Sequence, residues 1–164
     1  MKGMLLALLL GAVSSTSALA LDAPTGPVVL TVKGAITNTN AGNTAEFDLA
    51  MLEALAGRKA TMETPWTDGK VTFEGPLLSA LLEAVGSTGT LLSVKALNDY
   101  AAEVPAEDAK LATMLATRMD GKPMSVRDKG PLMIVYPFDQ NPDLYNEKYF
   151  SRSVWQIKEI EVSK

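Results

Sequence analysis

The chain has 164 residues, a formal net charge of −4 and neither cysteine nor histidine. The two missing residue types exclude a thiolate nucleophile, a Ser-His-Asp triad and an imidazole general base, and they remove the usual ligands of zinc, copper, haem and iron–sulfur centres. The acidic balance disfavours nucleic acid and anionic lipid as partners, because both bind basic surfaces.

The N-terminus predicts export. Lys2 precedes an apolar run, Met4–Val13, and Ala18-Leu19-Ala20 has the small-x-small pattern at which signal peptidase cleaves. The run is shorter than the roughly 20 apolar residues of a membrane-spanning helix. We therefore predict a signal peptide over residues 1–20 and a soluble periplasmic product without membrane insertion, whose residues 21–164 form one domain.

Short strands dominate the predicted elements. The β-branched run Val28–Lys33 predicts a first strand, Asp48 is placed to cap a helix, and Gly75-Pro76 predicts the start of a second helix. Strands are expected over 28–33, 58–63, 70–73, 91–95, 98–104, 111–119, 132–136 and 153–162, and helices over 49–55 and 77–85. This pattern predicts an α+β domain around a mostly antiparallel or mixed, barrel-like sheet with a few short helices.

Four segments, taken together, resemble the sulfite oxidase fold, which is the oxidoreductase molybdopterin-binding domain. They are Phe73–Leu82, Leu115–Met124, Asp128–Leu132 and Ser151–Val162. The similarity extends from about Val28 to the C-terminus. It implies a single sulfite oxidase-like domain with a pocket for a pterin.

The resemblance also identifies a missing ligand. Catalytic members of that family hold molybdenum through one cysteine sulfur, on a loop about a dozen residues before the glycine–proline–leucine turn. Here the region reads Thr61-Met-Glu-Thr-Pro-Trp66, and neither Met62 nor Thr64 replaces a thiolate. The chain therefore resembles short, cysteine-free periplasmic members. These imply a pterin ligand, such as a reduced tetrahydropterin, without molybdenum, and a non-catalytic relay to the periplasmic domain of a membrane-bound regulator of cyclic di-GMP.

A pterin needs a plane for stacking, a carboxylate for its donor edge and a donor for its O4 atom. Asn98-Asp99-Tyr100 supplies an amide, a carboxylate and an aromatic ring at the start of a predicted strand, although Asn and Asp also favour turns. Ser151-Arg152-Ser153-Val154-Trp155 supplies a guanidinium group, two hydroxyls and an indole. In a strand, Arg152 and Trp155 would point to opposite faces unless the strand begins after a bend, and Trp155 could instead belong to the core.

Three further residues are candidates. Arg118 and Arg127 flank the Asp120-Gly121 hairpin and could reach one cleft, although a surface arginine usually does nothing specific. Trp66 lies where the resemblance places the metal ligand and could cap the vacated space. The tract 106–109 is expected to be a solvated turn.

Three functions remain open. They are a pterin-binding sensor or carrier, a ligand-free interaction domain, and a molybdopterin-dependent oxidoreductase-like subunit; the missing cysteine favours a binding protein over an enzyme.

Overall fold

The computed structural model describes residues 20–164, so the predicted signal peptide, apart from Ala20, lies outside the described residues. The strands are β1 (Val28–Gly34), β2 (Ala45–Asp48), β3 (Gly57–Glu63), β4 (Lys70–Pro76), β5 (Leu91–Ala96), β6 (Ala101–Pro105), β7 (Met114–Ala116), β8 (Arg118–Met119), β9 (Lys122–Pro123), β10 (Met133–Val135) and β11 (Ile157–Ser163). The α-helices are α1 (Leu49–Glu53), α2 (Leu78–Ala84) and α3 (Glu147–Arg152), and the 3₁₀ helices are η1 (Ala106–Leu111), η2 (Val126–Asp128) and η3 (Pro142–Leu144).

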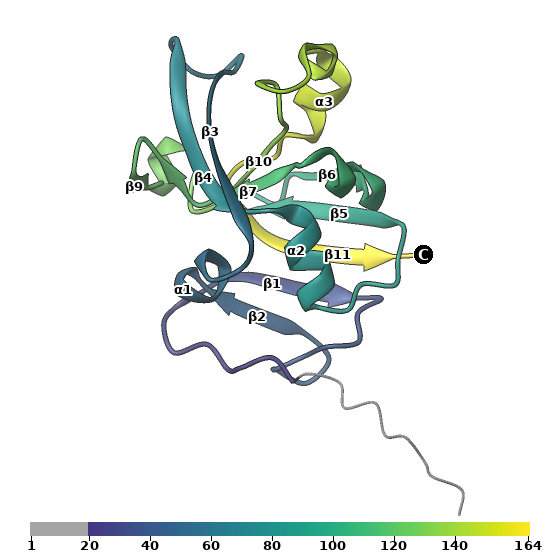
Figure 1. Ribbon diagram of the computed structural model, residues 1–164. Helices are drawn as coiled ribbons and strands as arrows, with labels where there is room; N and C mark the ends of the chain where they lie inside the picture. Colours follow the sequence, from purple (N-terminus) through teal and green to yellow (C-terminus); the bar gives the residue numbers. More distant parts are fainter. Residues whose placement is uncertain (1–19) are drawn as a thin grey trace, which may run out of the picture.

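The strands form three sheets. The largest has the order β2-β1-β11-β5-β6, in which β1 and β11 are parallel and the other neighbours are antiparallel. Strands β3, β4, β8 and β9 form an antiparallel sheet, and β7 pairs with β10. The long β3–β4 hairpin and α3 rise on the same side of the molecule (Figure 1). The predicted α+β fold, with mostly antiparallel and mixed β-structure and short helices, is confirmed.

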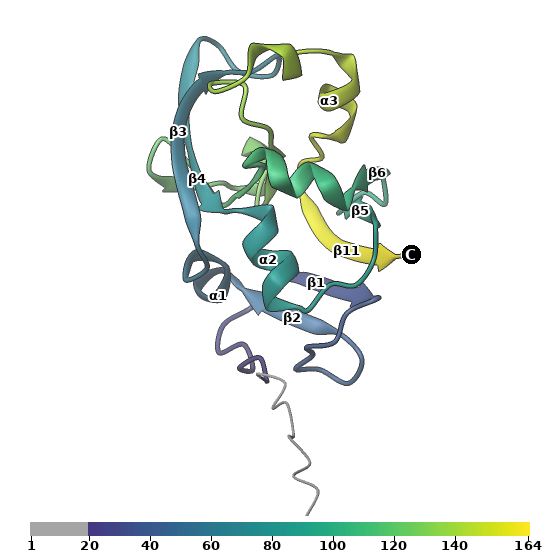
Figure 2. The ribbon, with the colours of Figure 1, turned by 45° about the vertical axis from the view of Figure 1, so that its right-hand side comes forward.

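Buried apolar side chains from all three sheets and from α1 and α2 join in one cluster, in which Tyr136, Phe47 and Phe73 are the largest fully buried side chains. Figure 2 shows α2 lying across the large sheet, where it buries Leu78 and Leu81. None of the helices formed by residues 20–164 has the length and apolar character that crossing a membrane requires.

Several local predictions are confirmed. Asp48 caps α1 by accepting a hydrogen bond from the Met51 amide at 2.8 Å. The same carboxylate accepts from the amides of Thr25 and Gly26 at 2.9 Å, so the segment before β1 is fixed to the fold. The Asp120-Gly121 hairpin joins β8 to β9 as expected.

Two predicted boundaries are wrong. Pro76 ends β4, where it pairs with Gly57, and α2 begins only after Leu77. The predicted strand 111–119 is divided, because Ala112 has a positive φ of 63° and because β7 and β8 pair with different strands, β10 and β4.

The C-terminal region differs most from the sequence prediction. The predicted strand 153–162 begins only at Ile157, because Gln156 has a positive φ of 55° and Ser153–Trp155 run as an irregular segment after α3.

Two segments in the middle of the chain also differ from the prediction. Asn98–Tyr100 form the turn between β5 and β6 and not the start of a strand. The tract 106–109 is not a solvated turn, since it belongs to η1 and Asp108 is only 4% exposed.

Candidate functional site

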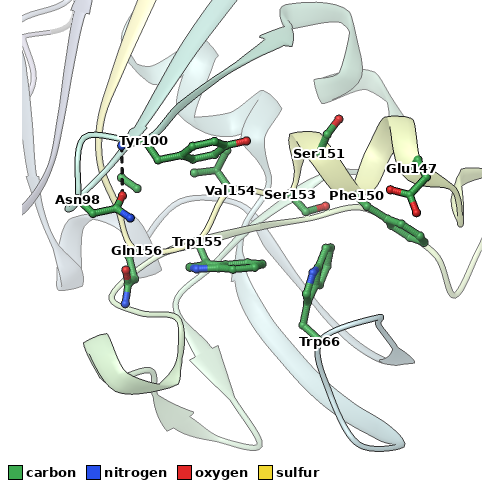
Figure 3. A pocket seen from close by; sticks show the side chains of 11 residues that line it. Trp66, Asn98, Tyr100, Glu147, Phe150, Ser151, Ser153, Val154, Trp155 and Gln156 are labelled. Atoms are coloured by element: carbon green, nitrogen blue, oxygen red, sulfur yellow. Dashed lines mark hydrogen bonds between the residues drawn. The ribbon is translucent and has the colours of Figure 1, made fainter.

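A surface pocket of about 420 Å³ lies between the β5–β6 turn, α3 and the segment that leads from α3 to β11 (Figure 3). Its lining consists of Trp66, Ala96, Asn98, Tyr100, Glu147, Phe150, Ser151, Ser153, Val154, Trp155 and Gln156. Five of the nine residues that the sequence predicted for the site therefore line it, and so does Trp66. The remaining four, Asp99, Arg118, Arg127 and Arg152, do not.

Aromatic rings form much of the wall. The ring of Trp66 meets Trp155 edge-on with centroids 5.6 Å apart, and it meets Phe150 edge-on at 5.8 Å. In Figure 3 the ring of Tyr100 lies above that of Trp155, while Trp66 stands nearly upright beside it. Tyr100 is 54% exposed and Trp155 37% exposed, so both rings remain open to a ligand. Trp155 is thus at the surface and does not belong to the core.

Local backbone structure places Tyr100 at the rim. The Asn98 side chain accepts a hydrogen bond from the Tyr100 amide at 3.2 Å, and Asp99 takes a positive φ of 65°. The Ala96 amide donates to the Tyr100 carbonyl at 2.8 Å and closes the turn. Asn and Asp favour such turns because their short side chains bond nearby backbone. The turn and the candidate site are therefore the same residues.

Helix α3 supplies the opposite wall. Asn146 caps it by accepting from the Lys148 amide at 3.0 Å. Glu147, Phe150 and Ser151 are spaced i, i+3 and i+4, so they share one face of the helix, and all three line the pocket. The sequence predicted a strand over 153–162 and no helix before it, so Glu147 and Phe150 were missed. The signal that would have found them is the Asn146 cap, which predicts a helix.

The polar groups of the pocket present mainly acceptors. The hydroxyls of Ser151 and Ser153 donate to the carbonyls of Lys148 and Tyr149, at 2.8 and 2.7 Å. The Gln156 amide group donates to the Val126 carbonyl at 2.7 Å. Each serine has thus used its one donor elsewhere, and Gln156 has used one of its two, which leaves oxygen lone pairs for a ligand. Asn98 is the opposite case, because its oxygen is engaged and its NH₂ group is left to donate.

Arg152 lies beneath the pocket wall. Its Nη1 contacts Oδ2 of buried Asp108 at 2.9 Å, and the same oxygen accepts from the Tyr136 hydroxyl at 2.7 Å. Burial, followed by the hydrogen bond to Asp108, raises the pKa of the Tyr136 phenol. The guanidinium also lies over the Tyr149 ring, 5.7 Å from its centroid. Arg152 therefore ties α3 to η1 and, through Asp108, to Tyr136, which follows β10.

The other three predicted residues face elsewhere. Asp99 is exposed and bonds Lys158 at 2.8 Å, and this contact lowers the pKa of its carboxyl. Arg118 forms a two-pronged pair with Glu53, with Nε–Oε1 at 2.7 Å and Nη2–Oε2 at 3.2 Å, which lowers the pKa of Glu53. Arg127 is exposed on η2. Arg118 and Arg127 thus do not meet in the pocket.

The segment expected to carry a metal ligand adjoins the pocket through Trp66. Met62 and Thr64 are both buried there, and the Thr64 hydroxyl already bonds the Thr67 hydroxyl at 3.0 Å. A thioether and an engaged hydroxyl do not match the thiolate that molybdenum requires in this fold. The residues present therefore do not fit a molybdenum centre, whereas the aromatic, acceptor-rich pocket fits an organic ring.

Comparison with known proteins bears on the family and the fold. Residues 31–164 match the family described as the oxidoreductase molybdopterin binding domain. The chain belongs to this family. No curated protein matches the chain. Among solved structures, the sulfane dehydrogenase SoxCD from Paracoccus pantotrophus is similar, with a TM-score of 0.60 and 17% identity. The match covers 82% of this chain and only 37% of that one, so it shows a shared fold and not a shared activity.

Proposed function

We propose that this chain is a periplasmic pterin-binding protein that acts by binding and not by catalysis. The observation that carries the proposal is the aromatic pocket: a molybdopterin-binding domain without cysteine keeps a cleft whose rings can stack on a flat heterocycle. Trp66, Tyr100, Phe150 and Trp155 line it. A largely apolar cleft with a few placed polar groups is typical of sites for small cofactors.

The acceptor-rich lining favours a reduced pterin. A tetrahydropterin carries N–H groups at N5 and N8, whereas the oxidised ring has acceptors at both positions. The hydroxyls of Ser151 and Ser153 donate elsewhere and the Gln156 side chain donates to Val126, so the side-chain oxygens of all three can accept from those N–H groups. An oxidised ring would place acceptor against acceptor at the same positions.

The proposal includes a relay to the periplasmic domain of a membrane-bound protein that controls cyclic di-GMP. Its support is the exposure of the pocket walls. Tyr100 and Trp155 are at the surface, so a stacked ring would cover them and change the surface that a partner meets. A ligand shifts such an equilibrium only by its difference in affinity between free and partner-bound protein.

Fluorescence titration tests the binding step directly, because both tryptophans of the chain line the pocket. A tetrahydropterin should quench the intrinsic emission with saturation, after correction with free tryptophan at the same absorbance. Trp66→Phe and Trp155→Phe keep an aromatic plane at each position and separate the two signals. Quenching that never saturates at millimolar ligand would refute the proposal.

The relay is tested by adding pterin to a pull-down between this chain and the periplasmic domain of a cyclic di-GMP-metabolising membrane protein encoded beside it. The retained fraction should change with pterin in the same concentration range as the quenching. A retained fraction that does not change with pterin would refute the relay and leave the proposal of pterin binding in place.

A further inference from the structure

The pocket holds one charged side chain whose role neither the fold nor the family explains. Of the described residues that line it, Glu147 alone is charged. Within residues 20–164 its carboxylate has no ion-pair or hydrogen-bond partner, whereas Asp99 and Asp108 bond Lys158 and Arg152. The structure thus places a free carboxylate beside the aromatic walls.

We infer that Glu147 is the specificity-determining residue of the pocket and that its carboxylate accepts hydrogen bonds from the C2 amino group and N3–H of the ring. This inference rests on the proposed pterin binding. A pterin presents two adjacent donors, the C2 amino group and N3–H, and a carboxylate can accept both in parallel. Such charge-assisted, two-point contacts are stronger and more selective than neutral hydrogen bonds.

The position of Glu147 suits this role. It lies in the first turn of α3, one turn before Phe150 and Ser151 on the same face. Figure 3 shows Glu147 on the side of the pocket that faces away from Asn98, with Tyr100 and Trp155 between them. A ring stacked on Trp155 would therefore have an acceptor at one end and the free NH₂ of Asn98 at the other. A pterin has its donor edge and its O4 acceptor on the same pyrimidine half, so Asn98 would meet the other end of the ligand or its side chain.

Lumazines supply a matched ligand. They share the bicyclic ring, N3–H and O4 but carry a carbonyl in place of the C2 amino group, so the same carboxylate would keep one donor and face an acceptor at C2. Sites that hydrogen-bond a ligand reject analogues that lack the group, since the protein group is left unpaired. Because Glu147 is exposed, we expect 6-methylpterin to bind about 10- to 100-fold more tightly than 6-methyllumazine, each compared in the same oxidation state.

The test titrates both ligands, in oxidised and tetrahydro forms, against wild type, Glu147→Gln and the control Glu83→Gln. Glu83 is an exposed glutamate on α2, outside the pocket lining. Glu147→Gln should weaken 6-methylpterin by about 10-fold or more and reduce the preference over 6-methyllumazine to about threefold or less. Glu83→Gln should keep the wild-type preference. Equal thermal midpoints for the three proteins exclude misfolding as the cause.

The outcomes separate the two proposals. Equal binding of pterin and lumazine to wild type, or an unchanged preference in Glu147→Gln, overturns the role of Glu147 and leaves pterin binding in place. Saturable binding of neither ligand in either oxidation state overturns pterin binding itself, and the inference with it.

Discussion

The buried Asp108 carboxylate gives the sharpest stability prediction. One oxygen of Asp108 accepts from the Tyr136 hydroxyl at 2.7 Å and from Arg152 at 2.9 Å. Tyr136 is fully buried, so Tyr136→Phe keeps the ring packed and removes only the hydroxyl. Hydrogen bonds to charged groups contribute about 1.5–3 kcal/mol, and we expect that loss in the free energy of unfolding.

Asp108→Ala should cost more, about 3–5 kcal/mol, because it leaves the Tyr136 hydroxyl and the partly buried Arg152 guanidinium without their acceptor. Tyr145→Phe is the matched control. Tyr145 is 47% exposed, and a surface change of this kind alters stability by no more than about 0.5 kcal/mol. Urea unfolding measures all three, with equal m-values as the condition for comparing midpoints. A Tyr136→Phe loss no larger than that of Tyr145→Phe would refute the reasoning.

The same network links stability to the pocket. Arg152 ends the helix that carries Glu147, Phe150 and Ser151, so its pair with Asp108 holds one wall in position. At a temperature where Asp108→Ala is still folded, its pterin affinity should therefore fall although Asp108 does not line the pocket. An affinity equal to wild type would show that the wall is held by the aromatic contacts of α3 alone.

Three further predictions concern single sites. Trp155→Ala should weaken tetrahydropterin binding by about 1–3 kcal/mol in titration monitored through Trp66, because it removes a stacking plane; an unchanged affinity would place the ring elsewhere. Gly75→Ala should destabilise far more than Gly26→Ala in urea unfolding, since an added Cβ at Gly75 would lie 2.2 Å from the Leu115 carbonyl oxygen whereas at Gly26 its nearest neighbour is 3.5 Å away. Hydrogen bonds from backbone amides, the Met51 amide first, lower the pKa of Asp48. The ionised carboxylate therefore contributes fully to the free energy of unfolding above the unfolded pKa of about 3.9, and this contribution is lost as pH falls through the folded pKa. Asp48→Asn should therefore flatten the acid limb of the urea midpoint between pH 5 and 2, and parallel limbs would contradict this.

The sequence predicted the elements whose signals are local. A β-branched run identified β1, Asp48 marked the start of α1, and Asp120-Gly121 marked a hairpin. Long-range geometry was not readable in the same way. The division of 111–119 between β7 and β8 follows from two different partner strands, β10 and β4. No residue type inside the segment predicts which strand each half pairs with.

The candidate site shows the same contrast between local signals, which the sequence carries, and long-range geometry, which it does not. Residue chemistry pointed to Asn98, Tyr100 and Trp155, and the structure brings them together although Trp155 lies more than 50 residues after the other two. The sequence prediction assigned the carboxylate to Asp99. In the structure Asp99 takes a positive φ of 65° and its carboxylate bonds Lys158 outside the pocket lining. The carboxylate that does line the pocket, Glu147, became visible only once α3 replaced the predicted strand.

Charge gives one more constraint on what the pocket accepts. Molybdopterin carries a dithiolate and a phosphate, and both are anionic. The only charge among the described lining residues is the carboxylate of Glu147, so such a ligand would meet a like charge there. A cation beside the lining is Lys129, whose Nζ lies 5.6 Å from the centroid of the Trp155 ring. The same lining offers oxygen acceptors from Ser151, Ser153 and Gln156. The missing thiol and the like charge of Glu147 thus act in one direction: each weakens the binding of the metal-bearing cofactor, and neither weakens the binding of a neutral, donor-rich pterin.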